Sequence, residues 1–206
     1  IDEMMLSLQN NRDLQTWLIH YIEDNLEEGS SWRIESTLMK LVKIYLVKTD
    51  FKGYNINRDD IKQYRDKLND IIKETQEGLK REFDNMNEFV ARNALDKTFF
   101  KDGAINPTFK LLSKAYNLDA FIGFLKNYHY RFISKDGLQN EVVSPKADID
   151  KSAGFVAICM RVVDLFYDYM SATSVKKDLY VVGILGDIQQ HIEAIMQREN
   201  VMPISD

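Results

Sequence analysis

The stretch that decides the fold is SAGFVAICMRVVDLFYDYM, residues 152–170. Placed on a helix of 3.6 residues per turn, it has apolar residues on both faces, and a helix of that kind is surrounded by other helices. Its apolar positions include Phe155, Val156, Ile158, Cys159, Met160, Val162, Val163 and Phe166. Ser144-Pro145 supplies a cap and a proline that suit a helix start. We therefore predict a buried central helix over about residues 145–172, with small residues such as Gly154 allowing a neighbour to approach closely.

The longest predicted element covers about residues 58–97, where one narrow apolar stripe runs between heavily charged faces. A stripe this narrow is typical of a helix that packs along one partner helix, from the same chain or from another. Thr75 interrupts the stripe and Gly78 weakens it, which would allow a bend or a split into two helices near them. The middle of the stripe is the predicted interaction seam, formed by Leu68, Ile72, Leu79, Phe83 and Met86.

Helical periodicity also accounts for most of the remaining chain. Further helices are expected over about residues 12–27, 32–48, 106–116, 118–132 and 175–198. Only 3 prolines and 9 glycines occur in 206 residues, a scarcity that favours helices over β-rich folds. A short β-hairpin over residues 130–143 competes with this pattern. We predict a single all-α domain over residues 1–206, a bundle of six or seven helices with the long amphipathic helix projecting from it or covering it.

Composition and charge exclude several classes of function. The net charge is −5 and charges of both signs are mixed along the chain without a run of five like charges, which argues against nucleic acid as a partner. No run of about 18 uncharged apolar residues is present, which argues against a membrane span. Without a signal-like start, we expect a cytoplasmic location. The single cysteine, Cys159, is expected to be a buried thiol that behaves as a small apolar residue.

Catalytic and metal-binding motifs are absent. No phosphate-binding loop, dinucleotide fingerprint, nucleophile elbow or EF-hand loop occurs. His20 with Asp24, and Asp187 with His191, have the i, i+4 spacing that places each pair on one helix face. Two such faces could form a four-ligand site, but hydrogen bonds along each helix explain them more simply. We expect no metal and no cofactor.

The stretch FLKNYHYRFISKDG, residues 124–137, offers the best candidate for a chemical site. His129 could act as a base and Arg131 could bind a phosphate group, while Asn127 and Tyr130 could orient a substrate. Alternatively, the stretch is a helix C-terminus whose cations suit the helix dipole. In helical register Leu125, Tyr128 and Phe132 point inward, which favours the helix end.

Residues 118–170 resemble the helical domains of HEPN-type and abortive-infection proteins. The matching pieces are LKNYHYRFISKDG, the cap VSPKAD and the apolar helix SAGFVAICMRVVDLFYDYM. The resemblance implies an all-α bundle from a bacterial or phage-related, defence-type system. In active members it also implies metal-independent RNA cleavage by an Arg followed four to six residues later by a His. No Arg in this chain has a His at that spacing, so no catalytic residue is transferred.

Together these patterns predict a non-enzymatic helical module for protein–protein interaction or assembly. Its partner would be another protein or a second copy, bound through the interaction seam. One alternative is a HEPN-like RNA-cleaving or RNA-binding protein with a rearranged site near His129 and Arg131. Another is a helical regulator that binds a small molecule. Enzymatic activity stays open, although the missing motifs argue against it.

Overall fold

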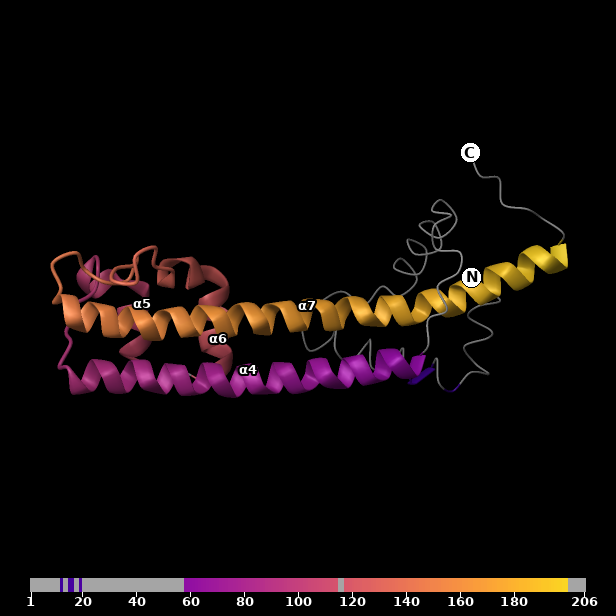
Figure 1. Cartoon of the computed structure of the whole chain (residues 1–206), viewed down its shortest axis with the longest axis horizontal. Helices are drawn as coiled ribbons and strands as arrows, with labels where there is room; N and C mark the ends of the chain where they lie inside the picture. The colour runs from indigo at the N-terminus through magenta and orange to yellow at the C-terminus, as the bar shows by residue number, and fades with distance from the viewer. Residues whose placement is uncertain (1–11, 13–14, 17–18, 20–57, 115–116, 200–206) are drawn as a thin grey trace, which may run out of the picture. The chain divides into compact units, whose positions relative to one another are not determined.

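A computed structural model describes residues 58–114 and 117–199, together with Arg12, Gln15, Thr16 and Ile19. These residues are mostly helical and contain no strand, which confirms the all-α class (Figure 1). The helices expected over residues 12–27 and 32–48 lie largely outside them. The described elements are α4 (Arg58–Arg92), η2 (Gly103–Ile105), α5 (Pro107–Leu112), α6 (Leu118–Tyr128), η3 (His129–Phe132) and α7 (Ile149–Glu199), where η marks a 3-10 helix.

The chain divides into two compact units. One unit is Leu68–Thr173, and the other combines Ile1–Lys67 with Ser174–Asp206. In the second unit the side chains of Ile61 and Leu179 are buried, and Lys62 Nζ lies 3.7 Å from Asp59 Oδ1. A single domain over residues 1–206 stays a prediction.

Helix α4 ends at Arg92, five residues before the predicted end. Ala94 adopts the left-handed conformation with a φ of 49°. The Leu95 amide then donates to Val90 O at 3.0 Å, and the Ala94 amide donates to Ala91 O at 3.1 Å. This is a Schellman motif, which usually places glycine in the left-handed position. Because alanine occupies that position here, the sequence gives no glycine signal for the helix end.

No break interrupts α4 at Thr75 or Gly78. The Thr75 hydroxyl is buried and donates to the carbonyls of Ile71 and Ile72, at 2.8 and 2.9 Å. Since its own helix satisfies this polar group, Thr75 is tolerated inside the apolar stripe. The helix is therefore not divided into two near Thr75 and Gly78.

Helix α7 is one helix where two were predicted. It begins at Ile149, after Asp148, whose carboxylate accepts a hydrogen bond from the Lys151 amide at 2.9 Å as an N-cap. The linking residues 171–174 contain neither proline nor glycine, so nothing in them forces a break. The helix is also less enclosed than predicted, because an exposed strip runs beside its buried face. The exposed strip contains Ala157, Arg161, Asp164, Tyr167 and Asp168.

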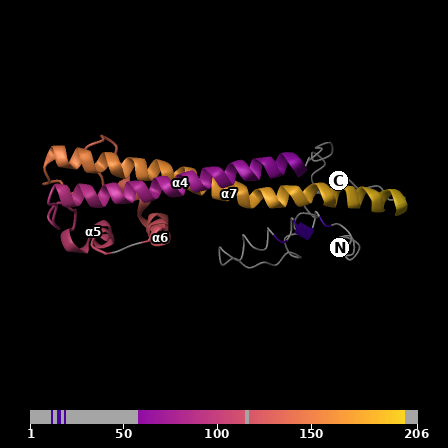
Figure 2. The same ribbon diagram turned by 90° about the horizontal axis from the view of Figure 1, so that it is seen from below.

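Within the unit Leu68–Thr173, α4 and α7 lie side by side and run in opposite directions (Figures 1 and 2). A Cβ atom on Gly78 would lie 2.9 Å from Leu165 Cδ2, and one on Gly154 would lie 2.9 Å from Phe89 Cε2. Between these contacts, Arg161 Nη2 donates to Glu82 Oε2 at 3.0 Å. In all three pairs the residue numbers add to 243, so the three contacts define one antiparallel register.

Aromatic side chains fill the core around this helix pair. The Phe155 ring of α7 packs edge-on against Phe99 and Phe100, with ring centroids 5.6 and 5.8 Å away. Helix α6 covers α4 by placing Phe121 4.7 Å from Phe83, measured between ring centroids. The short helices α5 and α6 thus complete a core that α4 and α7 begin.

The β-hairpin expected over residues 130–143 does not form. Residues 129–132 are the 3-10 helix η3, and the segment takes part in a single antiparallel bridge, between Val143 and Phe100. The Glu141 amide donates to Arg131 O at 3.0 Å, as in a hairpin. The side chain of Asn140, however, accepts hydrogen bonds from the Val142 and Val143 amides, which prevents a regular ladder there.

The close approach at Gly154 gives the first prediction. Gly154→Leu should lower the free energy of unfolding by at least about 1 kcal/mol, because overpacking against the Phe89 ring outweighs the gain in helix propensity. Gly123→Leu in α6 is the matched control, since a Cβ atom there has nothing within 4 Å. Gly123→Leu should raise the free energy of unfolding by roughly 0.5–1 kcal/mol. Urea denaturation followed by circular dichroism measures both, and equal effects of the two changes would contradict the tight contact.

Candidate functional site at the loop junction

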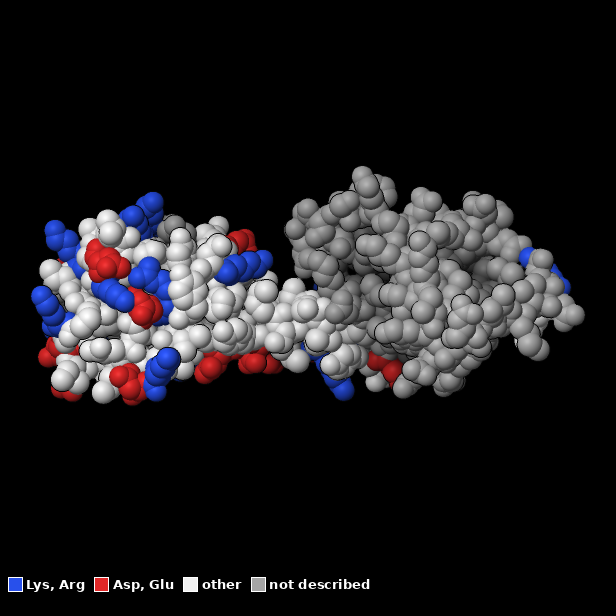
Figure 3. All heavy atoms as spheres, turned by 90° about the horizontal axis from the view of Figure 1, so that it is seen from above, with Lys and Arg blue, Asp and Glu red and all other residues white. Residues whose placement is uncertain are grey.

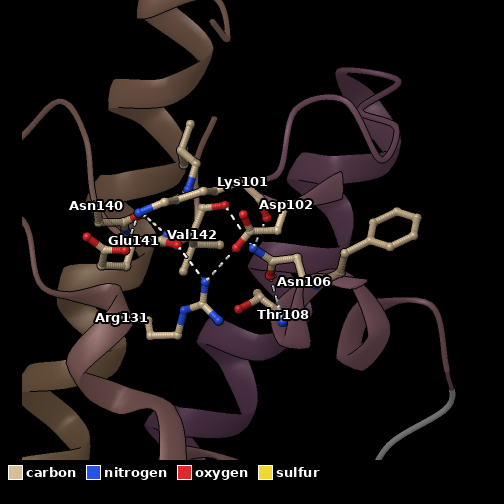
Figure 4. A network of polar contacts seen from close by, with 10 residues as sticks. Lys101, Asp102, Asn106, Thr108, Arg131, Asn140, Glu141 and Val142 are labelled. Atoms are coloured by element: carbon tan, nitrogen blue, oxygen red, sulfur yellow. Dashed lines mark hydrogen bonds and ion pairs between the residues drawn. The ribbon is translucent and has the colours of Figure 1, made fainter. Parts of the chain in front are cut away.

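The loop after α4, the 3-10 helix η3 and the loop before α7 meet within the unit Leu68–Thr173 (Figure 4). The Lys101 amide donates to Val142 O at 2.8 Å, and the Ser144 amide donates to Phe99 O, also at 2.8 Å. We call this region the loop junction. Its polar side chains are Lys101, Asp102, Asn106, Arg131, Asn140 and Glu141.

Asn106 is the most fully bonded residue of the loop junction. Its side chain is completely buried, and its Nδ2 donates to Lys101 O at 2.6 Å and to Val142 O at 3.3 Å. Its Oδ1 accepts hydrogen bonds from the Thr108 and Phe109 amides, at 2.9 and 3.3 Å. One amide group therefore caps α5 and joins the two loops.

Asn140 makes a similar set of bonds from the other loop. Its Nδ2 donates to Phe132 O at 3.1 Å, while its Oδ1 accepts from the Val142 and Val143 amides at 2.9 and 3.2 Å. Both asparagines thus replace backbone partners that a regular strand would provide. The loops keep a defined path without a sheet.

Arg131 joins the same loops by charge. Its Nη2 donates to Glu141 O at 3.0 Å and lies 3.6 Å from Asp102 Oδ2. Lys101 pairs with the Glu141 carboxylate. The hydrogen bond from Lys101 holds the pKa of Glu141 below its usual range, and the positive charges of Lys101 and Arg131 act in the same direction. Two cations and two carboxylates leave the loop junction with no net charge.

One polar group of this region has no hydrogen-bond partner among the described residues. Thr108 Oγ1 is fully buried, and in Figure 4 it lies on the side of Arg131. A buried hydroxyl without a partner typically costs about 1–3 kcal/mol. Thr108 therefore weakens the loop junction locally while Asn106 stabilises it.

An open depression of about 520 Å³ adjoins the loop junction. We call it the loop depression. Its lining residues are Lys101, Tyr130, Ile133, Lys135, Asp136, Gln139, Asn140, Glu141, Val143 and Pro145. Asp136 accepts hydrogen bonds from the amides of Leu138 and Gln139, and these bonds hold its pKa below the usual range.

The structure does not bring the predicted site residues His129 and Arg131 onto a common partner. His129 Nδ1 lies 2.9 Å from Leu125 O, and its ring packs 5.3 Å from Phe166 of α7. Arg131 instead faces Asp102 and Glu141. The tautomer of His129 that suits this contact donates from Nδ1 to the helix carbonyl. The two side chains thus stabilise different parts of the fold.

The stretch 124–137 contains the end of α6, the 3-10 helix η3 and the loop that follows it. Asn127 Nδ2 donates to Gly123 O at 3.0 Å, a bond within its own helix. Leu125 and Phe132 are fully buried and Tyr128 is half-buried. The prediction that these side chains point inward is confirmed for Leu125 and Phe132, and Tyr128 is only partly enclosed.

The predicted interaction seam lies partly in the core. Leu79, Phe83 and Met86 belong to the buried cluster of the same chain, and Leu68 is also buried. Ile72 is half-buried. Three of the five residues therefore pack against this chain's own helices.

Neither a metal cluster nor a membrane-spanning helix occurs in the described part of the chain. Residues 58–114 and 117–199, with the four described near the N-terminus, contain no group of three or more His, Cys, Asp and Glu that could hold a metal ion. Of the two predicted histidine–aspartate pairs, His20 and Asp24 lie outside the described residues, as do the side chains of Asp187 and His191. Within the described helices, none is long and apolar enough to cross a membrane.

No protein-family model, curated protein or solved structure matches this chain. The resemblance of residues 118–170 to HEPN-type domains therefore stays a prediction.

The bonds of Asn106 give the second prediction. Asn106→Ala should lower the free energy of unfolding by about 2–4 kcal/mol, because it removes a helix cap and leaves two carbonyls without their shared donor. Asn117→Ala is the matched control, since Asn117 caps α6 through one exposed bond to the Ala120 amide at 2.9 Å. Its expected cost is about 1 kcal/mol. Denaturant titrations measure both free energies of unfolding. An equal decrease in the two variants would show that the bonds of Asn106 between the loops do not stabilise the fold.

The third prediction concerns the Cys159 thiol. Cys159 is completely buried, and burial raises the pKa of its thiol to about 12. Iodoacetamide at pH 8 should therefore modify the folded protein at least about 100-fold more slowly than the protein in guanidinium chloride. Mass spectrometry over time measures this ratio, and similar rates would contradict the burial.

The same pKa shift has a consequence for stability. In the unfolded chain the thiol ionises near its ordinary pKa of 9.0, before it ionises in the folded protein. The contribution of the neutral thiol is thus complete below pH 9 and is lost as the pH rises toward 12.

Proposed function

We propose that this chain is a non-enzymatic helical module for protein–protein interaction or assembly, in a bacterial or phage-related, defence-type system. The observation that supports the proposal is a difference between the polar and the apolar side chains at the loop junction. Its polar side chains bond to one another and to the backbone, whereas three large apolar side chains nearby face solvent. Tyr130, Ile133 and Leu138 are 56, 39 and 46% exposed.

The engagement of the polar groups argues against catalysis at this site. A general base needs a free proton-accepting atom close to a substrate in a site that excludes water. Among the candidates, Arg131 bonds two loops and His129 packs on α7. The loop depression is also open to solvent, so it offers little desolvation.

The charge distribution supports the same proposal. Figure 3 shows Lys and Arg interspersed with Asp and Glu over the visible face of the unit Leu68–Thr173. A nucleic-acid surface would gather cations along one face. A mixed surface with exposed apolar side chains fits a protein partner better.

The contact proposed here lies away from the predicted interaction seam. Because Leu79, Phe83 and Met86 are in the chain's own core, a partner could reach them only by opening the fold. The exposed apolar residues around the loop depression need no such opening. We therefore place the proposed contact at Tyr130 and its neighbours.

The fourth prediction tests this proposal by affinity purification. The full chain is cross-linked to its bound proteins in a lysate of its source cells and then purified. A specific partner protein should be recovered with it. Tyr130→Asp should reduce the amount of that partner at least about tenfold. Ile105→Asp is the matched control, because Ile105 is 70% exposed in the other 3-10 helix, η2, and does not line the depression. Its recovery should equal that of the wild type. Circular dichroism confirms that both variants fold.

Two results would contradict the proposal. One is recovery of no specific protein, combined with a monomer in light scattering. The other is cleavage of added RNA by the wild type that His129→Ala abolishes, which would favour the HEPN-like alternative.

A further inference from the structure

The loop that follows η3 is connected to α7 through a sulfur atom. The Ser134 amide donates to Met160 Sδ at 3.3 Å, and it has no other acceptor among the described residues. Within the described part of the chain, this is the one hydrogen bond that joins residues 133–139 to an α-helix. We call residues 133–139 the sulfur-linked loop. Because a thioether is a weak acceptor, this loop is attached to α7 less firmly than a backbone carbonyl would attach it.

Ser134 also organises the sulfur-linked loop. Its Oγ donates to Asp136 Oδ1 at 3.0 Å and accepts a hydrogen bond from the Gly137 amide at 2.9 Å. The same carboxylate oxygen accepts hydrogen bonds from the Leu138 and Gln139 amides, at 3.0 and 3.1 Å. The turn is thus bonded within itself, and its first residue carries the bond to the helix behind it. A displacement at that residue therefore moves the whole turn.

Met160 combines partial access to solvent with a contact that depends on its sulfur. Among the described methionine side chains, Met86 is completely buried and Met170 is 36% exposed, whereas Met160 is half-buried and packs against the core. The neighbouring Cys159 is completely buried, and burial raises the pKa of its thiol to about 12. Since the thiolate is the form that reacts, Cys159 does not compete with Met160 for an oxidant.

Oxidation changes the atom that holds the sulfur-linked loop. A hydroperoxide such as hydrogen peroxide transfers one oxygen atom to Met160 Sδ. The O–O bond breaks and an S–O bond forms, so the sulfur loses two electrons and the peroxide is reduced to water. An oxygen on the lone pair that faces the Ser134 amide stands between the two atoms and separates them. An oxygen on the other lone pair brings a polar atom into the packing of the core.

We propose that Met160 is a reversible oxidation switch, which releases the sulfur-linked loop from α7 when a hydroperoxide converts the thioether to the sulfoxide. The loop carries Ile133 and Leu138, two of the exposed apolar side chains assigned to the partner contact. Its release therefore alters that contact, and reduction of the sulfoxide restores it. The effect on a partner rests on the proposed interaction function, whereas the oxidation and the release of the loop do not.

Hydrogen–deuterium exchange followed by mass spectrometry tests the switch on the full chain. The wild type is treated with hydrogen peroxide until peptide mapping shows the sulfoxide at Met160. Amides in residues 133–139 should then exchange at least about tenfold faster, whereas amides in residues 79–86 of α4 should exchange as before. Methionine sulfoxide reductases for both sulfoxide epimers, supplied with a dithiol reductant, should restore the original rate.

Two leucine variants separate Met160 from the other methionines. Met160→Leu keeps a similar volume but has no sulfur to oxidise, so peroxide should leave its exchange over residues 133–139 unchanged. Each variant is compared with its own untreated sample, because Met160→Leu itself removes the acceptor of the Ser134 amide. Met170→Leu, at an exposed methionine of the same helix, is the matched control and should respond to peroxide as the wild type does.

Three results would overturn the inference. One is that peroxide leaves Met160 unoxidised while the fold is intact. Another is a sulfoxide at Met160 that leaves exchange over residues 133–139 unchanged, or that accelerates residues 79–86 equally, since the latter is general unfolding and not release of the loop. The third is a response of Met160→Leu to peroxide that equals the response of the wild type.

Failure of the switch and failure of the proposed function are distinguishable, because the exchange measurement needs no partner. If peroxide releases the loop while Tyr130→Asp leaves partner recovery unchanged, the switch is retained and the proposed contact is wrong. If Tyr130→Asp prevents recovery while oxidation of Met160 leaves the exchange unchanged, the contact is retained and the switch is wrong.

Discussion

The antiparallel contact between α4 and α7 is the constraint on which the described fold depends. Two glycines allow the helices to approach closely, at Gly78 against Leu165 and at Gly154 against Phe89, and the ion pair between Glu82 and Arg161 lies between them. A shift of one residue along either helix would place side chains where the glycines now are. Steric exclusion at two separated points therefore sets the register more strongly than one exposed ion pair can.

The position of the loop junction follows from this register. Because Phe89 contacts Gly154, the last turns of α4 lie beside the first turns of α7. The chain leaving α4 and the chain entering α7 must therefore meet at the same end of the pair. The bridge between Phe100 and Val143 forms there, and Asn106 and Asn140 supply the remaining backbone partners. The candidate site is thus a product of the helix pairing.

Sequence periodicity predicted the helices, whose buried faces repeat along the chain. It did not predict helix ends and contacts that depend on a single residue. The stripes of α4 and α7 were recognisable because a helix repeats its core contacts every three or four residues. The role of Gly154 in close packing was also predictable from its size. Gly78 was interpreted as a weak point, although it is a contact point, because sequence alone does not show which helix faces it. The end of α4 was missed because an alanine adopts the left-handed conformation.

The loop junction was the least predictable part for a related reason. Asn106 stands where a helix over residues 106–116 is expected to begin, but its bond to Val142 joins residues 36 positions apart. A side chain that bonds to distant backbone produces no repeat, and its partner is known only when the fold is known. The alternative of a hairpin over residues 130–143 does not form for the same reason, since the Asn140 side chain accepts hydrogen bonds from the Val142 and Val143 amides.

The cluster around His129 shows how hydrogen-bond accounting changes a functional interpretation. Amide, imidazole and guanidinium groups in five consecutive positions suggest chemistry when only their types are known. In the fold, Asn127 bonds to its own helix, His129 to a helix carbonyl and Arg131 to the opposite loop. A group already bonded in this way must break a contact before it can act on a substrate. The side chains still free to act are therefore the exposed ones beside the cluster, above all Tyr130.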